Sequence, residues 1–94
     1  MKVRFTDTAR RELGEILARI AADNPNATTA VANAIKVASD RLRAFPHIGS
    51  ATEARGIYMR IARPYQYLIF YSIEGSTVFI QHVRHPARKR PPKP

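Results

Sequence analysis

Cysteine is absent from the 94-residue chain, which excludes both a disulfide framework and a thiolate metal site. This absence fits a reducing compartment, and we expect a cytoplasmic protein. No apolar run approaches the ~20 residues of a membrane-spanning helix, and the polar start of the sequence does not resemble a secretory leader. We therefore expect no membrane association, and a chain of this length predicts a single domain.

Acidic residues are scarce: seven Asp and Glu stand against 16 Lys and Arg, for a net charge of +9. Five of the positive charges fall between Arg84 and Lys93, where there is no acid. A small domain this basic typically meets nucleic acid, an anionic membrane or an acidic protein segment, although a surface that only favours solubility is the alternative. Because prolines crowd the end of the chain, we expect residues 1–88 to form the domain and residues 89–94 to form a flexible basic tail.

The segment 65–83 predicts a β-hairpin around which the rest of the chain is organised. Its two apolar runs, 67–71 and 78–80, flank a turn at Gly75, which permits the positive φ that a short hairpin requires. Both faces of each run carry apolar side chains, so the hairpin is expected at the centre of a sheet. One face is expected to receive helices, and the other to carry tyrosines and arginines. Strict alternation along the second strand places on one face Val78, Ile80 and His82, and on the other Thr77, Phe79, Gln81 and Val83.

The segment before the hairpin begins with a short strand and continues as two helices. Residues 2–5 alternate polar and apolar side chains, with Val3 and Phe5 expected inward, and Thr6 or Asp7 then offers an oxygen to cap a helix. The apolar side chains that follow recur at helical spacing in two groups: Leu13, Ile16, Leu17 and Ile20, then Ala27, Val31, Ala34, Ile35, Ala38, Leu42 and Phe45.

The two predicted helices meet at Asn24-Pro25, where the residue before proline leaves the helical region and proline begins the next helix with Asn24 as its cap. Pro46 ends the second helix, and a pattern of period two returns from residue 57 to residue 62. The resulting order, β-α-α-β-β-β, predicts an α+β domain in which a helical hairpin packs on an antiparallel sheet of three or four strands.

No metal or cofactor site is predicted. His47, His82 and His85 lack the spacing and the carboxylates of a ligand cluster, and the sequence contains neither a nucleophile elbow nor a glycine-rich phosphate loop. A metal-free ribonuclease would need a base, an acid and cations to stabilise a phosphorane. Candidates for these roles are Arg60, Arg63, Tyr65, Tyr71, His82, Arg84, His85 and Arg88, with Glu53 as an acid. They form no complete set, and each also has a structural interpretation, so enzymatic activity stays open.

Four groups of residues, in this order and spacing, resemble the toxins of the RelE/ParE superfamily, and its ParE branch in particular, over residues 3 to 88. They are Phe5-Thr6 with Ala9 and Leu13; Asn24-Pro25 with Ile35, Leu42, Pro46 and Gly49; Arg60 with Tyr67-Leu68-Ile69-Phe70-Tyr71; and His85-Pro86-Ala87-Arg88.

The resemblance implies a toxin of a type II toxin–antitoxin pair, neutralised by direct binding of an acidic antitoxin. ParE-like toxins inhibit DNA gyrase, whereas RelE-like toxins cut mRNA on the ribosome, and the shared fold does not decide between them. The Asn-Pro junction and the closing His-x-x-Arg favour the ParE branch, so we predict a gyrase inhibitor. The alternatives are a ribosome-dependent mRNA endonuclease and a family member without toxicity.

The expected antitoxin contact combines two modes of peptide recognition. We expect a helix of the antitoxin to fill a groove beside the helical hairpin, bordered by the alanine-rich second helix, and its extension to add a strand to the sheet edge. Acidic antitoxin side chains would then meet the expected binding residues, which are Arg60, Arg84, Arg88 and Lys89.

Overall fold

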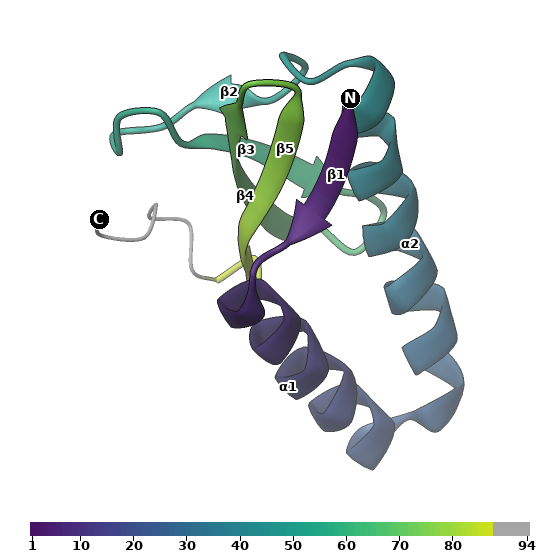
Figure 1. Cartoon of the computed structure of the whole chain (residues 1–94). Coiled ribbons are helices and arrows are strands. Elements are labelled where there is room, and N and C mark those ends of the chain that lie inside the picture. The colour runs from purple at the N-terminus through teal and green to yellow at the C-terminus, as the bar shows by residue number, and fades with distance from the viewer. Residues whose placement is uncertain (88–94) are drawn as a thin grey trace.

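The computed structural model describes residues 1–87; Arg88 and the expected tail, 89–94, lie outside the described residues. The elements are β1 (Lys2–Phe5), α1 (Asp7–Asp23), α2 (Pro25–Ala44), β2 (Ser50–Ala51), β3 (Tyr58–Ala62), β4 (Tyr67–Glu74) and β5 (Thr77–Arg84). The strands form one five-stranded sheet in the order β1-β5-β4-β3-β2 (Figure 1), with β4 and β5 inside it. The predicted α+β class is confirmed.

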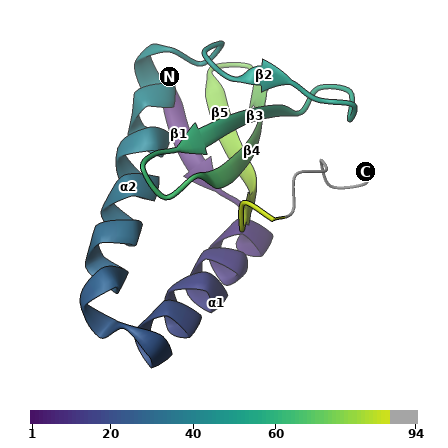
Figure 2. The same ribbon diagram turned by 180° about the vertical axis from the view of Figure 1, so that it is seen from behind.

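The helices begin and end close to the positions that the sequence indicates. The Thr6 Oγ1 accepts a hydrogen bond from the Ala9 N–H at 3.1 Å and so caps α1. Asn24 stands at the N-cap of α2 with Pro25 following it, but its side chain makes no capping hydrogen bond. The two helices meet at this junction to form a hairpin that opens toward the sheet (Figure 2). Neither described helix has the length and apolar character that a membrane span requires.

The core lies between the helical hairpin and one face of the sheet. It is built from buried side chains of both layers, namely Ala9, Val31, Ile35 and Leu42 from the helices and Ala62, Ile69, Tyr71, Val78, Ile80 and Val83 from the sheet. Val3 and Phe5 of β1 pack against it, as their alternation predicts. Full burial of a side chain of this size contributes about 1.5–3 kcal/mol, so this layer holds the two helices on the sheet.

A β-bulge at Gln81 changes which side chains of β5 face the core. Phe70 lies opposite His82, but the next residue of β4, Tyr71, lies opposite Ile80, so Gln81 has no partner across the ladder. An extra residue in one strand inverts the alternation beyond it. The prediction that His82 shares a face with Ile80 is therefore wrong: His82 lies opposite Phe70, outside the core, and its ring meets α1 at Glu12.

The expectation that tyrosines and arginines occupy the face away from the helices is wrong for three tyrosines and one arginine. Tyr58 and Tyr67 pack against the helix-facing core. Tyr71 is fully buried within the core, and Arg60 of β3 lies opposite Ile69, a core residue. Directly opposed residues point to the same face, so Arg60 lies on the helix-facing side of the sheet. The alternation along β3 and β4 is as expected, but alternation alone does not say which of two apolar faces receives the helices.

The two edges of the sheet depart from the prediction of a three- or four-stranded antiparallel sheet. β1 lies beside β5 and runs parallel to it, with Lys2 opposite Thr77 and Phe5 opposite Ile80. At the other edge β2, only Ser50–Ala51, pairs with β3. A two-residue strand has no periodicity, so the sequence pattern could not reveal it.

Candidate functional site

The structure forms a groove of about 500 Å³ between α1 and the ends of the central strands. Its lining combines apolar side chains with charges of both signs: Ile16, Ile20, Tyr67 and Val83, with Arg11, Arg19, Arg84, Glu12, Glu15, Asp23 and His85. The α1 members recur every three or four residues and so share one helix face. No lining residue of this groove comes from α2, so it is not the groove that the sequence led us to expect along the alanine-rich second helix, which stays a prediction.

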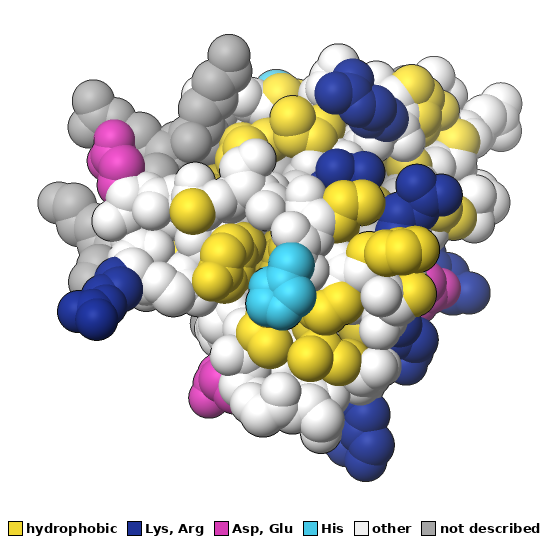
Figure 3. All heavy atoms as spheres, turned by 90° about the horizontal axis from the view of Figure 1, so that it is seen from above, with side chains coloured by type: hydrophobic (Ala, Val, Ile, Leu, Met, Phe, Trp, Pro, Cys, Tyr) yellow, Lys and Arg dark blue, Asp and Glu magenta, His cyan; other side chains and the backbone are white. Residues whose placement is uncertain are grey.

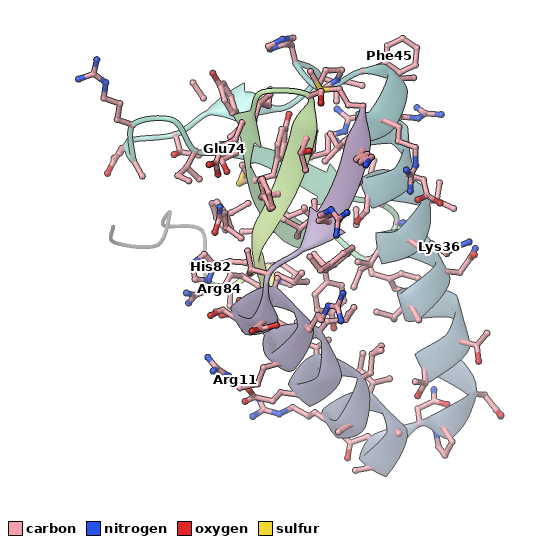
Figure 4. The ribbon with its side chains drawn as sticks, in the orientation of Figure 1. Arg11, Lys36, Phe45, Glu74, His82 and Arg84 are labelled. Carbon is pink, nitrogen blue, oxygen red and sulfur yellow. The ribbon has the colours of Figure 1, made fainter. Side chains whose placement is uncertain are left out.

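The Glu12 carboxylate contacts three residues of β5 and so joins α1 to that strand. Its Oε1 lies 3.0 Å from the His82 Nδ1 and accepts the Val83 N–H at 3.2 Å. Its Oε2 lies 3.2 Å from the Arg84 Nε, whose N–H is not aimed at the oxygen, so this contact is an ion pair without an aligned hydrogen bond. β1 has already ended at Phe5, so the carboxylate completes the edge of β5 where no strand continues. Figure 4 shows His82 and Arg84 at this end of the sheet, beside the start of α1.

Glu12 was not among the residues that the sequence pointed to, because the apolar pattern of α1 names only its hydrophobic positions. The side chain of Glu12 is only 18% exposed, and those of His82 and Arg84 are 21% and 24% exposed. One signal was available: Glu12 precedes Ile16 and Ile20 at four-residue intervals, which places an acid on the inward face of the helix. An acid in line with an apolar stripe indicates a buried partner of opposite charge or a free backbone N–H.

The structure brings together three of the predicted site residues: Arg84 and His85 line the groove, and His82 meets Arg84 at the Glu12 carboxylate. The His85 ring stands edge-on to the Tyr67 ring, with centroids 5.8 Å apart, a favourable aromatic arrangement. Arg84 is engaged by Glu12, so an acidic ligand would meet it as one member of an ion pair. Arg88 and Lys89 lie outside the described residues.

The other predicted site residues lie away from the groove. Arg60 lies on β3, where its charge lowers the pKa of Tyr71 as the smallest of several contributions. Arg63 and Tyr65 are exposed in the turn between β3 and β4, and Glu53 is exposed in the loop after β2. In residues 1–87, no three His, Asp or Glu side chains are placed to hold a metal ion.

Tyr71, another candidate from the sequence, fixes the loop after α2. Its hydroxyl donates to the Pro46 carbonyl oxygen at 2.8 Å and accepts the Gly49 N–H at 2.9 Å. Burial raises the pKa of this hydroxyl above its usual value of 10.0, although the Gly49 N–H opposes the shift. Gly49 is required here, because a Cβ at that position would lie 2.5 Å from the hydroxyl oxygen. The side chain is therefore a structural clamp.

A helical hairpin packed on a five-stranded sheet, with a charged groove beside the first helix, defines a small α+β domain. A solved structure described as "Chromosomal ParDE TA system from P. aeruginosa" shares the fold, with a TM-score of 0.75 and 13% identity over 90% of this chain and 95% of that one. A family profile described as "ParE toxin of type II toxin-antitoxin system, parDE" matches residues 3–90.

The chain therefore belongs to the ParE toxin family of type II toxin–antitoxin systems, as its resemblance predicted. Membership in this family implies an antitoxin as partner. A comparison with curated proteins found no match.

Proposed function

We propose that this toxin binds and inhibits DNA gyrase, and that an acidic antitoxin neutralises it by binding directly to the α1 groove. The observation that carries the proposal is a groove with an apolar floor, from which the candidate arginines Arg60 and Arg63 lie apart. Such a floor, with a few polar groups around it, is the usual anatomy of a recognition site.

Dispersal of the cations favours binding over RNA cleavage. Stabilising a phosphorane requires donors that converge on one point. Arg60 lies on the helix-facing side of β3, Arg63 lies in the next turn, and Arg84 is already paired with Glu12. Within residues 1–87, these guanidinium groups do not converge on a common site.

The groove suits an amphipathic antitoxin helix. Ile16, Ile20 and Val83 provide an apolar floor, the kind of surface that receives anchor residues of a docked helix. The charges around it are partly neutralised within the toxin, since Arg11 lies 3.5 Å from Glu15 in an exposed pair. Exposed ion pairs contribute only about 0–1 kcal/mol each, so the floor supplies most of the affinity and charge chiefly raises the association rate.

The antitoxin site is tested by Ile16→Asp, with Ala21→Asp as its control at an exposed position of the same helix that does not line the groove. The groove variant should bind the cognate antitoxin at least about tenfold more weakly through faster dissociation, because a charge is buried on binding, while the control binds as the wild type does. Raising salt should slow association several-fold and leave dissociation nearly unchanged. Circular dichroism verifies folding, and Ile20→Asp serves as a second variant. Normal binding by both folded groove variants would contradict the proposal.

The target is tested by inducing the chain without its antitoxin and measuring plasmid supercoiling and mRNA integrity in the same cells. We expect growth arrest with loss of gyrase supercoiling and intact mRNA. Purified toxin should also inhibit supercoiling by purified gyrase. Cleavage of mRNA at ribosomal A-sites would contradict gyrase inhibition, and the absence of growth arrest would indicate a family member without toxicity.

A ribosome-dependent mRNA endonuclease is the second candidate, because Arg84, His85 and Tyr67 line one groove. In that mechanism Arg84 would stabilise the charge on phosphate and His85 would transfer a proton. His85→Gln would then abolish RNA cleavage without affecting folding, whereas the gyrase proposal expects no RNA cleavage to abolish.

A further inference from the structure

Exposed hydrophobic side chains concentrate around α2 and its exit. Among residues 1–87, the large hydrophobic side chains that are exposed are Met1, Val37, Phe45, Ile48 and Tyr65. Tyr65 is in the turn between β3 and β4, but the other four belong to α2, to the loop after it, or to the N-terminus, whose ammonium group donates to the Arg43 carbonyl oxygen at 3.1 Å. We call these four residues the Phe45 surface. Figure 4 shows the Phe45 ring projecting from the end of α2.

The backbone that carries Phe45 and Ile48 is hydrogen-bonded, although both side chains are exposed. The Phe45 N–H donates to the Arg41 carbonyl oxygen at 3.0 Å, and the Ile48 N–H donates to the Phe45 carbonyl oxygen at 3.2 Å. The Tyr71 hydroxyl binds the same loop at two further backbone atoms. Phe45 keeps 60% of its surface in contact with solvent, so this order does not come from its own burial. A hydrogen-bonded backbone has little conformational entropy left to lose on binding, which favours recognition.

Positive charge borders the Phe45 surface. Val37, Arg41 and Phe45 follow one another at four-residue intervals and therefore lie along one line of α2. The nearby acid, Asp40, lies between two cations, 3.6 Å from Arg43 and 4.0 Å from Lys36. In the view onto this end of the molecule, hydrophobic side chains gather on the face, and lysines and arginines border them along one side (Figure 3).

We propose that the Phe45 surface docks a segment of the toxin's protein target in which apolar side chains are surrounded by Asp and Glu. This inference rests on the proposed function, in that the toxin acts by binding a protein, but it concerns a different surface. A central aromatic anchor with a polar rim is typical of the energetically important part of a protein interface. The cations around the anchor select an acidic partner.

Two other occupants fit the same surface less well. A second copy of this chain would bring one surface bordered by cations against another, and like charges in an interface are unfavourable. Nucleic acid would match the charge, but bases stack on aromatic rings, and Met1, Val37 and Ile48 offer none.

The Phe45 surface is also distinct from the antitoxin groove. Phe45 lies at the end of α2, whereas Arg11 and Arg84, which line the groove, lie at the opposite end of the sheet (Figure 4). An antitoxin helix that fills only the groove would leave the Phe45 surface open.

Phe45→Asp tests this inference, with Asn26→Asp as a control that adds the same charge at the far, exposed end of α2. Binding of both variants and the wild type to purified gyrase, purified ribosomes and the cognate antitoxin is measured, and folding is checked by thermal melting. The Phe45 variant should bind the target about tenfold or more weakly and bind the antitoxin within about twofold of the wild type, because the groove is untouched. Arg41→Gln with Arg43→Gln should slow association with the target several-fold.

Each outcome bears differently on the two proposals. If wild type binds gyrase and Phe45→Asp binds it equally well, the inference is wrong and the proposed target stands. A second outcome is that wild type instead binds ribosomes through a ribosomal protein, with Phe45→Asp losing that binding. In that case the proposed target is wrong and the inference stands. Contact with ribosomal RNA, loss of antitoxin affinity, self-association through this surface, or failure of wild type to bind either target would overturn the inference.

Discussion

Removing one oxygen atom should show how firmly the loop after α2 is held. Tyr71→Phe keeps the buried ring and deletes the hydroxyl that joins Pro46 to Gly49. Each lost hydrogen bond leaves a backbone group without that partner, at a cost of about 1–3 kcal/mol if water cannot replace it. Because the loop lies at the surface, water satisfies part of this loss, and we expect the free energy of unfolding to fall by about 2 kcal/mol.

The measurements are urea unfolding and thermal unfolding, both followed by circular dichroism at neutral pH. A loss of this size should lower the melting temperature by about 8–16 °C in a domain of about 100 residues. Tyr65→Phe is the matched control, because the Tyr65 ring is 40% exposed, and its stability should stay within about 0.5 kcal/mol of wild type. If Tyr71→Phe changed the free energy of unfolding no more than the control does, the hydrogen bonds of the Tyr71 hydroxyl would not be what holds the loop.

Alkaline pH gives the same variant a second readout. Burial raises the pKa of Tyr71 above 10.0, so the folded chain retains this proton more tightly than the unfolded chain does. The stability linked to the neutral hydroxyl is then fully present below about pH 10 and is lost as pH rises through the folded pKa. Phenylalanine cannot ionise, so the stability difference between wild type and Tyr71→Phe should shrink above about pH 10. A difference that stayed constant up to pH 11 would contradict the assigned burial.

Two further pairs of substitutions test the packing by urea unfolding. Gly49→Ala should cost about 2 kcal/mol or more, because its Cβ would lie 2.5 Å from the Tyr71 hydroxyl oxygen, whereas Gly14→Ala in α1, with open space around it, should gain about 0.5–1 kcal/mol. Equal effects would refute the steric argument. Glu12→Gln should cost about 1–2 kcal/mol, because it removes the charge that faces two half-buried partners, while Glu15→Gln, in an exposed pair, should change little. If Glu12→Gln left the free energy of unfolding unchanged, α1 would be held on the sheet by its apolar face alone.

Local chemistry in the sequence predicted much of the fold. Gly75 has a φ of 60° in the hairpin turn, Thr6 caps α1, and Pro25 begins α2. Each of these features depends on the properties of a few neighbouring residues, which is why a sequence pattern can reveal it.

Features that depend on distant parts of the chain could not be predicted in the same way. The parallel pairing of β1 with β5 joins segments at opposite ends of the domain, and no local propensity encodes such a partner. The bulge at Gln81 has no glycine to mark it, and it decides which side of the sheet His82 occupies. The candidate site was predicted only in part for the same reason, since Glu12 gains its role from strand residues that the helix meets after folding.

The pairing of the first strand with the last also sets when this toxin becomes complete during its own synthesis. Lys2 pairs with Thr77, which is synthesised 75 residues later. At a translation rate of about 5–20 residues per second, the delay is about 4–15 seconds. The groove is subject to the same delay, because Val83, Arg84 and His85 line it. A chain that ends before these residues therefore has neither the finished sheet nor the α1 groove. Only synthesis that reaches β5 yields the complete fold.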